Sequence, residues 1–456
     1  MIRTCHIQYD FYQDLSIEEQ YRGNTLEPSF YINVDITPES IREYRIQKQE
    51  SINNKNKNVQ YKVVSDYEGD YCGTSQENQF RKVSERIYEA TLDNEKYQFQ
   101  TPIEDLTNSI NCLNINWSAI AKFPDGYILG DQTGSIHTYD TQWKSKNILK
   151  NVHKDEITSL RCFPSGSVLL SASNDMQIKL WSLLDDSNPR TFIGHTAGIT
   201  DTALLGRGRN FLSSGRDGTI RLWECGSGQN IYTLTRKETP YDPVNSIILF
   251  DGENQGKKEK DKQGLKSHEL EFETEGKQVA AAHESGVITF HDLYTKKEQL
   301  QLPNEFISTC NVVANNLDMN NYYLFAGYEN GVVAQWDIRS PNKSLSHVKL
   351  EGTLNSINTM VWSGSSPSYS YDQSSLYISA GIDTSLRILL TAEGILPIES
   401  VPQFLVCDDY KVTQYLVIQD SENMTQVKKD LSEKNEVVAI GNRGFISIYQ
   451  DLLVME

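Results

Sequence analysis

Short apolar segments of strand-like pattern, separated by tight turns, recur along most of the chain. Two neighbouring segments, SVLLSASNDMQIKLWS (167–182) and RNFLSSGRDGTIRLWE (209–224), align without a gap. Each predicts a strand, a turn that holds an aspartate, and a second strand that ends at a tryptophan. The aspartates are Asp175 and Asp217, and Trp181 and Trp223 each follow six positions later. This pattern is typical of an all-β repeat protein.

The same frame fits five weaker copies along the chain. Their turn positions are Thr133, Ser285, Asn330, Asp383 and Arg443. The shortest spacing between turns is about 42 residues, and a period of about 40–45 residues with strand–turn–strand content is typical of WD40 β-propellers. We therefore predict an all-β fold with a seven-bladed WD40 propeller, one blade for each copy.

Three polar segments lengthen the spacing between copies. They are residues 251–276, 363–375 and 419–435, and each falls between the first and second strands of its repeat. In a propeller these connections leave on one face, the bottom, whereas the turns after second strands and the connections into first strands open on the other face, the top. The sequence thus predicts inserted loops on the bottom and an unobstructed top.

The two strong repeats carry the residue types of the WD40 structural tetrad. In that tetrad the aspartate accepts a hydrogen bond from the imidazole, the imidazole bonds the hydroxyl, and the hydroxyl accepts from the indole N–H. The first set is His153, Ser171, Asp175 and Trp181, and the second is His195, Ser213, Asp217 and Trp223.

Serine, histidine and aspartate also form hydrolase triads, so a catalytic interpretation competes with the structural one. A catalytic site occurs once, whereas this constellation occurs twice at the repeat period and on inner strands. Phosphate-binding loops, H-E-x-x-H, G-x-S-x-G and EF-hand sequences are absent from the chain. We interpret both sets as structural and predict no catalysis, no metal and no cofactor.

Charge and composition restrict the partners. Lysine and arginine number 43 against 61 acidic residues, which gives a net charge of −18. Such a surface repels phosphate backbones and favours a basic protein partner, so we predict no nucleic-acid binding. The seven cysteines form no C-x-x-C pair, and no apolar run approaches the roughly 20 residues of a membrane span. With no signal-peptide pattern either, we expect a monomer without membrane attachment, in the cytoplasm or also the nucleus.

Residues 1–105 lie outside the repeat and predict a small strand-rich domain before a propeller of residues 106–456. Segments 6–12 and 30–36 alternate like half-buried strands, and 86–101 predicts a hairpin that turns at Asp93-Asn94. Residues 45–61 are polar and predict a loop. An alternative stays open: some of these strands, or the C-terminal DLLVME (451–456), supply the outer strand that closes the propeller.

Several segments resemble one family in particular. They are HIQYDF (6–11), FYINVD (30–35), GRNFLSSGRDGTIRLWECGSG (208–228) and AGYENGVVAQWDIRSP (326–341). They resemble the proteasomal ATPase-associated factor family of WD40 assembly chaperones, and the similarity runs almost end to end. The resemblance implies a non-catalytic protein that binds the C-terminal domain of a proteasomal AAA ATPase subunit and promotes assembly of the base of the 19S regulatory particle. The chain departs from the family in its longer polar stretch 41–80 and in the insertion 251–276.

A scaffold or substrate receptor in another complex, such as a ubiquitin ligase, is the alternative function, because propellers serve many partners. A helical docking segment before the propeller would favour it, and residues 1–105 predict strands instead. We predict that the partner binds the acidic top face. The candidate contact residues are Asp155, Glu156, Glu238, Asp242, Glu284, Glu329, Asp408 and Asp409, with Tyr328 as an aromatic anchor.

Overall fold

The structure is a computed structural model of the 456-residue chain. It describes residues 2–8, 11, 29–37, 40–53, 56–66, 78–107, 114–251, 268–315, 322–351, 356–364, 374–391, 396–397, 401–407, 410–418 and 436–450. Within these residues nearly every regular element is a β-strand. No helix in the described part of the chain is long and apolar enough to cross a membrane.

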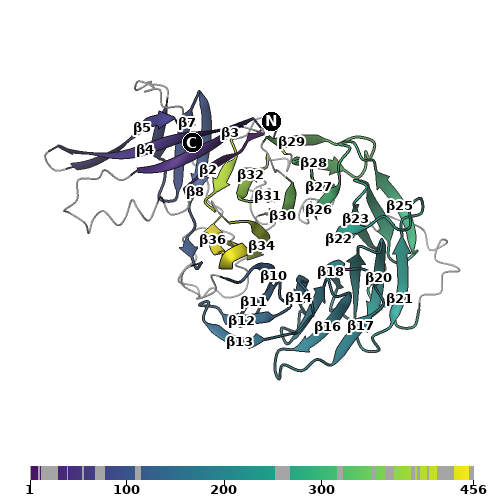
Figure 1. Cartoon of the computed structure of the whole chain (residues 1–456). Helices are drawn as coiled ribbons and strands as arrows, with labels where there is room; N and C mark the ends of the chain where they lie inside the picture. Colours follow the sequence, from purple (N-terminus) through teal and green to yellow (C-terminus); the bar gives the residue numbers. More distant parts are fainter. Residues whose placement is uncertain are drawn as a thin grey trace, which may run out of the picture.

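Antiparallel sheets arranged in a circle form the body of the protein (Figure 1). Successive strands of each sheet pair with their sequence neighbours, and we call each sheet a blade and name it by its first strand. The β10 blade contains β10 (Trp117–Phe123), β11 (Gly126–Asp131), β12 (Ile136–Asp140) and β13 (Ser145–Leu149). The β14 blade contains β14 (Ile157–Cys162), β15 (Val168–Ser173), β16 (Gln177–Ser182) and β17 (Arg190–Ile193). The β18 blade contains β18 (Ile199–Leu205), β19 (Asn210–Gly215), β20 (Thr219–Glu224) and β21 (Asn230–Thr235).

The circle continues through four further blades. The β22 blade contains β22 (Val244–Asp251), β23 (Lys277–His283), β24 (Ile288–Asp292) and β25 (Lys297–Leu302). The β26 blade contains β26 (Cys310–Asn315), β27 (Tyr323–Tyr328), β28 (Val332–Asp337) and β29 (Ser346–Glu351). The β30 blade contains β30 (Ile357–Ser363), β31 (Ser375–Ala380), β32 (Thr384–Leu389) and β33 (Gln403–Leu405), and the β34 blade contains β34 (Val412–Ile418), β35 (Glu436–Gly441), the 3-10 turn η2 (Asn442–Gly444) and β36 (Ile446–Gln450). First strands of successive blades contact each other, and β34 contacts β10 to close the circle. The predicted all-β propeller is confirmed.

Each first strand contains a β-bulge at the same point, one residue after its start. The bulged residues all have short polar side chains: Ser118, Thr158, Thr200, Asn245, Asn311, Asn358 and Thr413. Several donate to a main-chain carbonyl at the start of the next blade, as Ser118 Oγ does to Ile157 O at 2.6 Å. Thr413 Oγ1 donates to Trp117 O at 2.8 Å, from the β34 blade to the β10 blade. Because a bulge turns its extra residue out of the ladder, these side chains are free to tie neighbouring blades together.

Strands β1 and β6 to β9, from the N-terminal part of the chain, extend the outer edges of three successive blades. Strand β1 (Ile2–Arg3) pairs in parallel with β29, and β9 (Glu104–Asp105) pairs with β36. Strands β6 (Gln79–Lys82), β7 (Ile87–Leu92) and β8 (Glu95–Gln100) extend the β30 blade, because β8 pairs in parallel with β33. The outer strand of the β34 blade is therefore β9, from residues before the repeat. Residues 451–456 lie outside the described residues.

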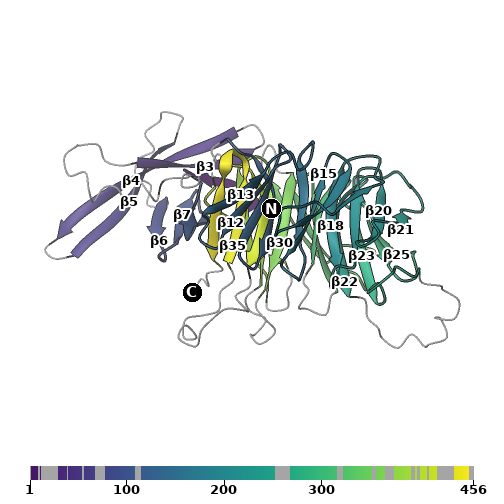
Figure 2. The ribbon, with the colours of Figure 1, turned by 90° about the horizontal axis from the view of Figure 1, so that it is seen from below.

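A separate sheet of β2 (Cys5–Ile7), β3 (Ser29–Thr37), β4 (Ser40–Asn53) and β5 (Asn56–Asp66) lies beside the propeller (Figure 2). Strands within 6–12 and 30–36 are confirmed by β2 and β3. The predicted hairpin at 86–101 is also confirmed: β7 and β8 pair, and Asp93 and Asn94 have φ of 49° and 65° as a type I′ turn requires. Aromatic contacts among Phe11, Phe30 and Phe80 hold this sheet against the extended β30 blade.

The prediction of a loop at 45–61 is wrong. Residues in this segment belong to β4 and β5, which pair as a long hairpin. The far end of the hairpin projects away from the propeller in Figures 1 and 2. A projecting strand pair needs no alternating apolar face, so its sequence lacks the period that identifies half-buried strands. The predicted insertions 251–276 and 363–375 join first and second strands of the β22 and β30 blades but are only partly described, and 419–435 lies outside the described residues.

Candidate functional site

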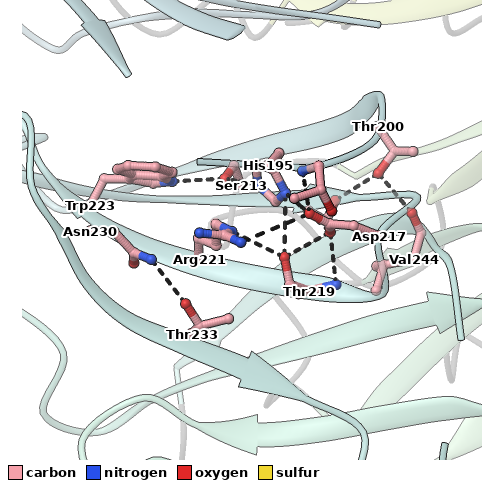
Figure 3. Close-up of polar contacts among 12 residues, drawn as sticks. His195, Thr200, Ser213, Asp217, Thr219, Arg221, Trp223, Asn230, Thr233 and Val244 are labelled. Carbon is pink, nitrogen blue, oxygen red and sulfur yellow. Dashed lines mark hydrogen bonds and ion pairs between the residues drawn. The ribbon is translucent and has the colours of Figure 1, made fainter. Parts of the chain in front are cut away.

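The tetrad of the β18 blade joins its top turn to its inner strands (Figure 3). His195 Nδ1 lies 3.0 Å from Asp217 Oδ2, and His195 Nε2 lies 2.7 Å from Ser213 Oγ. Trp223 Nε1 donates to the same hydroxyl at 2.8 Å. The Asp217 carboxylate also accepts from the N–H and the hydroxyl of Thr219. It therefore links the top turn to His195 in the connection into the blade. Each of the four side chains of this tetrad has a hydrogen-bond partner within it, as burial requires.

The β14 blade repeats this arrangement. His153 Nδ1 lies 3.0 Å from Asp175 Oδ2, His153 Nε2 lies 2.8 Å from Ser171 Oγ, and Trp181 Nε1 donates to that hydroxyl at 3.1 Å. Burial raises the pKa of Asp175, but hydrogen bonds from His153 and from the N–H of Lys154 outweigh it and lower the pKa to about 2. Ser171 and Ser213 are fully buried, so neither hydroxyl is open to a substrate in this structure.

The β10 blade stabilises its top turn with an aspartate in a different position. Asp131, the last residue of β11, accepts from the N–H groups of Thr133 and Ser135. Its other carboxylate oxygen lies 3.0 Å from His137 Nε2. Burial raises the pKa of Asp131, and the bonds from His137 and the turn more than compensate, so the pKa is lowered. A buried carboxylate thus stabilises this top turn without the sequence spacing of the two strong repeats.

Asp242 is a correction to the predicted contact residues. It is only 7% exposed, and its carboxylate accepts from Arg236 Nη1 at 2.7 Å and from Ser285 Oγ at 2.6 Å. It also accepts from the N–H of Ser285 and lies 3.7 Å from His283 Nδ1. The connection into the β22 blade folds inward, so this carboxylate stabilises the blade's top turn and is not presented to a partner.

Tyr328 is a second correction. It is the last residue of β27 and is fully buried, with its ring centroid 5.0 Å from that of Phe306. Its side chain faces the core between the β22 and β26 blades. The position beside an exposed turn residue suggested a surface anchor, but the strand alternation places its ring inside.

The other described candidates are acids on the top face. Asp155, Glu238, Glu284 and Glu329 are exposed, while Glu156 is half-buried and accepts from Asn174 Nδ2 at 3.3 Å. Burial, and then the neighbouring Asp155, raises the pKa of Glu156. The turn after β23 holds Glu284, and that after β27 holds Glu329. Asp408 and Asp409 lie outside the described residues.

Sequence reasoning missed exposed apolar side chains on the same top face. Tyr241 is 87% exposed and Ile307 is 92% exposed, and both lie in connections into first strands. Met176 and Ile382, in turns after second strands, are 43% and 55% exposed. An apolar residue in a turn belongs to no alternating pattern in the sequence. Its exposure is therefore known only from the accessible surface of the folded protein. No group of three or more histidine, cysteine, aspartate or glutamate residues suited to a metal ion occurs among the described residues.

The propeller and its tetrads define the chain as a WD40 repeat protein. The family pattern described as "WD domain, G-beta repeat" matches residues 143–182 and 187–224, which contain most of the β14 and β18 blades. Over its whole length the chain is similar to the 26S proteasome regulatory subunit RPN14 of Saccharomyces cerevisiae, with 38% identity over 455 residues that cover 98% of each protein. The chain belongs to this family, the one that its N-terminal and repeat segments resemble.

Other relatives share only a part of the chain. Mouse pre-mRNA-processing factor 17 is 40% identical over 91 residues, which are 20% of this chain and 16% of that protein. Subunit I of eukaryotic translation initiation factor 3 from Nematostella vectensis is 25% identical over 240 residues, which are 52% of this chain and 64% of that protein. These matches cover only part of the chain, whereas the similarity to the yeast protein covers 98% of it and so includes the N-terminal strands.

Proposed function

We propose that this protein is a non-catalytic chaperone that promotes assembly of the base of the proteasome's 19S regulatory particle. The observation that carries the proposal is the end-to-end similarity to a yeast protein named as a 26S proteasome regulatory subunit. Because that similarity covers 98% of both chains, it includes the N-terminal strands as well as the repeats. A role in proteasome-associated protein–protein contacts follows from the family, and the chaperone role is the specific form that we propose.

In this proposal the protein acts as a monomer. Its partner, the C-terminal domain of a proteasomal AAA ATPase subunit, binds the top face. The chain carries a net charge of −18, and Glu238, Glu284 and Glu329 are exposed there. Acidic groups on an open face accelerate encounter with a basic surface and disfavour acidic competitors. The fully buried hydroxyls of Ser171 and Ser213 support a binding role over a hydrolytic one. We place this activity in the cytoplasm or the nucleus.

Binding of the purified protein to isolated C-terminal domains of the six proteasomal ATPases tests the proposal. We expect one or two domains to bind, with an affinity that falls as salt rises from about 50 to about 200 mM, because screening weakens contacts between exposed charges. Charge reversal at the top, Glu329→Lys or Glu284→Lys, should weaken capture about tenfold or more.

The matched control is Asp125→Lys, which reverses another exposed acid, in the turn between β10 and β11 on the bottom face. This variant should bind as the wild type does. Equal loss in the control and the top-face variants would show a response to net charge and contradict the assignment of the face. Failure of all six domains to bind would reject the ATPase partner and favour a scaffold in another complex.

A further inference from the structure

Two apolar side chains on the top face are almost fully exposed. Among the large apolar residues that the structure describes, Ile307 and Tyr241 have the largest exposed fractions, 92% and 87%. Tyr241 lies in the connection from β21 to β22, and Ile307 lies in the connection from β25 to β26. They therefore flank the top of the β22 blade, one on each side. Exposed apolar surface rimmed by polar residues is typical of contact sites.

Hydrogen bonds connect the two loops through the turn between them, residues 284–286. The N–H of Glu284 donates to Pro243 O at 3.0 Å, two residues beyond Tyr241. Asn304 Nδ2 donates to Ser285 O at 2.7 Å and ties the second loop to the same turn. Tyr241, the 284–286 turn and Ile307 thus belong to one continuous surface, which we call the β22 top patch.

The second loop is also fixed to the next blade. Asn330 Nδ2 donates to Phe306 O at 3.2 Å, and the N–H of Asn330 donates to Ser308 Oγ at 3.0 Å. These bonds hold the residues on either side of Ile307 while its own side chain stays in solvent. The patch is therefore preorganised, which lowers the entropy that binding must remove.

The backbone conformation at Ile307 indicates that its side chain does not serve the stability of the fold. Its φ is 50°, in the left-handed region, which disfavours β-branched residues strongly and suits glycine or asparagine. At 92% exposure the side chain does not pack against the fold in return. Glycine would serve the free protein better at this position, so the isoleucine has no role in stability that the structure shows.

Acidic groups surround the two apolar side chains. Glu284 and Glu329 are exposed, and neither carboxylate forms an ion pair with another residue in the described part of the chain. Glu238 is 71% exposed and lies 3.3 Å from Arg236 Nη2, whose guanidinium is held mainly by buried Asp242. Lys237, which precedes Glu238 in the chain, is also exposed. The balance is acidic: Glu284 lies in the turn between the two apolar side chains, Glu238 lies in the Tyr241 loop, and Glu329 lies in the top turn of the next blade.

We infer that the β22 top patch binds an amphipathic basic helix, with apolar side chains on Tyr241 and Ile307 and lysine or arginine beside Glu284 and Glu329. This inference rests on the proposed function in one respect: it assigns the helix to the ATPase C-terminal domain. The apolar pair supplies two desolvated anchor points, and the carboxylates between and beside them pair with the basic side chains of the helix. Selectivity requires both features, because an acidic helix is repelled and a purely charged one leaves the centre unfilled.

Tyr241→Ser and Ile307→Gly test the apolar centre against the C-terminal domain that the wild type binds. Each should weaken binding about tenfold or more through faster dissociation, with the salt dependence unchanged, because an apolar contact is not screened. Ile307→Gly should at the same time raise the melting temperature of the free protein, since it relieves the left-handed backbone. Weaker binding by a more stable protein cannot arise from misfolding.

Leu184→Ser is the matched control. Leu184 is 85% exposed in the connection between β16 and β17, on the bottom face. This variant should bind as the wild type does. Wild-type affinity in both Tyr241→Ser and Ile307→Gly would overturn the inference while leaving the ATPase partner intact.

A synthetic helical peptide of leucine and lysine tests the patch even where no ATPase domain binds. Fluorescence anisotropy should show binding to the wild type and to Leu184→Ser, and binding at least tenfold weaker for the Tyr241→Ser/Ile307→Gly double variant. A peptide with glutamate in place of lysine should not bind. Equal affinity of the leucine–lysine peptide for all three proteins would refute the patch independently of the proposed function.

Discussion

The β18 and β22 blades solve the same structural problem with residues from different places in the chain. In the β18 blade, Asp217 comes from the top turn and its histidine, His195, from the connection into the blade. In the β22 blade the carboxylate of Asp242 comes from that connection, and the histidine, His283, ends the second strand. A buried carboxylate receives hydrogen bonds from the top turn in both.

The comparison shows why a propeller can keep its fold while its sequence repeat becomes weak. The requirement is a buried carboxylate that accepts hydrogen bonds from the N–H and hydroxyl groups of the top turn. Either the turn itself or the connection into the blade can supply this carboxylate. A search for fixed spacing finds the β18 pattern and misses the β22 pattern. For the same reason Asp242 looked like a surface acid, although its burial makes it part of the blade.

Asp242→Ala should have the largest effect on stability among the changes that test this comparison. It leaves the guanidinium of Arg236, whose side chain is 9% exposed, without its closest partner. Removal of one member of a buried ion pair costs about 3–5 kcal/mol, and we expect about 3 because Glu238 still lies near. Urea unfolding measures the loss. A change below about 1 kcal/mol would mean that the β22 blade does not depend on this carboxylate.

Ser213→Ala should have the next largest effect. It removes the hydroxyl that accepts from Trp223 Nε1 and contacts His195 Nε2, and leaves two buried polar groups without that partner. The expected cost is about 2 kcal/mol of unfolding free energy. The matched Ser171→Ala variant in the β14 blade should lose a similar amount. A large loss in one and none in the other would show that the two tetrads are not equivalent.

Asp175→Asn should change how stability depends on pH. The carboxyl has a folded pKa of about 2, below its ordinary value of 3.8, so the ionised form stabilises the folded protein. The contribution is about 2 kcal/mol when complete, above about pH 4, and it is lost as the pH falls towards about 2. Acid unfolding of the wild type should be steeper in this range than that of the variant. Parallel curves would contradict the assigned shift.

Glu284→Ala should have the smallest effect on stability, within about 0.5 kcal/mol, because the side chain is exposed. Asp242 and Glu284 belong to the same blade, so this variant separates an acid that stabilises the fold from one that is available for binding. Thermal unfolding of Glu284→Ala and of Asp242→Ala under the same conditions makes the comparison. A loss comparable to that of Asp242→Ala would mean that exposure does not distinguish the two acids.

Much of the fold could be predicted because the relevant signals are local. Alternation and turn chemistry located β2, β3 and the β7–β8 hairpin, and two full tetrads fixed the repeat. The bulged residues from Ser118 to Thr413 are a signal that was present but unused, a short polar residue just after the start of each first strand. The projecting β4–β5 hairpin could not be recognised, because its sequence lacks the alternation that burial on one face imposes.

The candidate site was predicted less well. The exposed acids Glu238, Glu284 and Glu329 could be placed in top loops by counting strands, but burial of Asp242 and Tyr328 depends on how those loops fold back. Tyr241 and Ile307 went unnoticed for the complementary reason. An apolar residue in a turn is usually packed, and the residues next to it in the sequence do not indicate when it is exposed.

The sequence by itself determined the class of fold, the position of the two tetrads and the acidic character of the protein. These follow from residue type, spacing and net charge, which need no knowledge of distant contacts. Tertiary structure alone decided that β9 completes the β34 blade, that β1 and β8 extend two others, and which top-face residues remain accessible. Those outcomes depend on pairing between segments hundreds of residues apart, such as Asp105 with Ser447, and no local pattern encodes such a pairing.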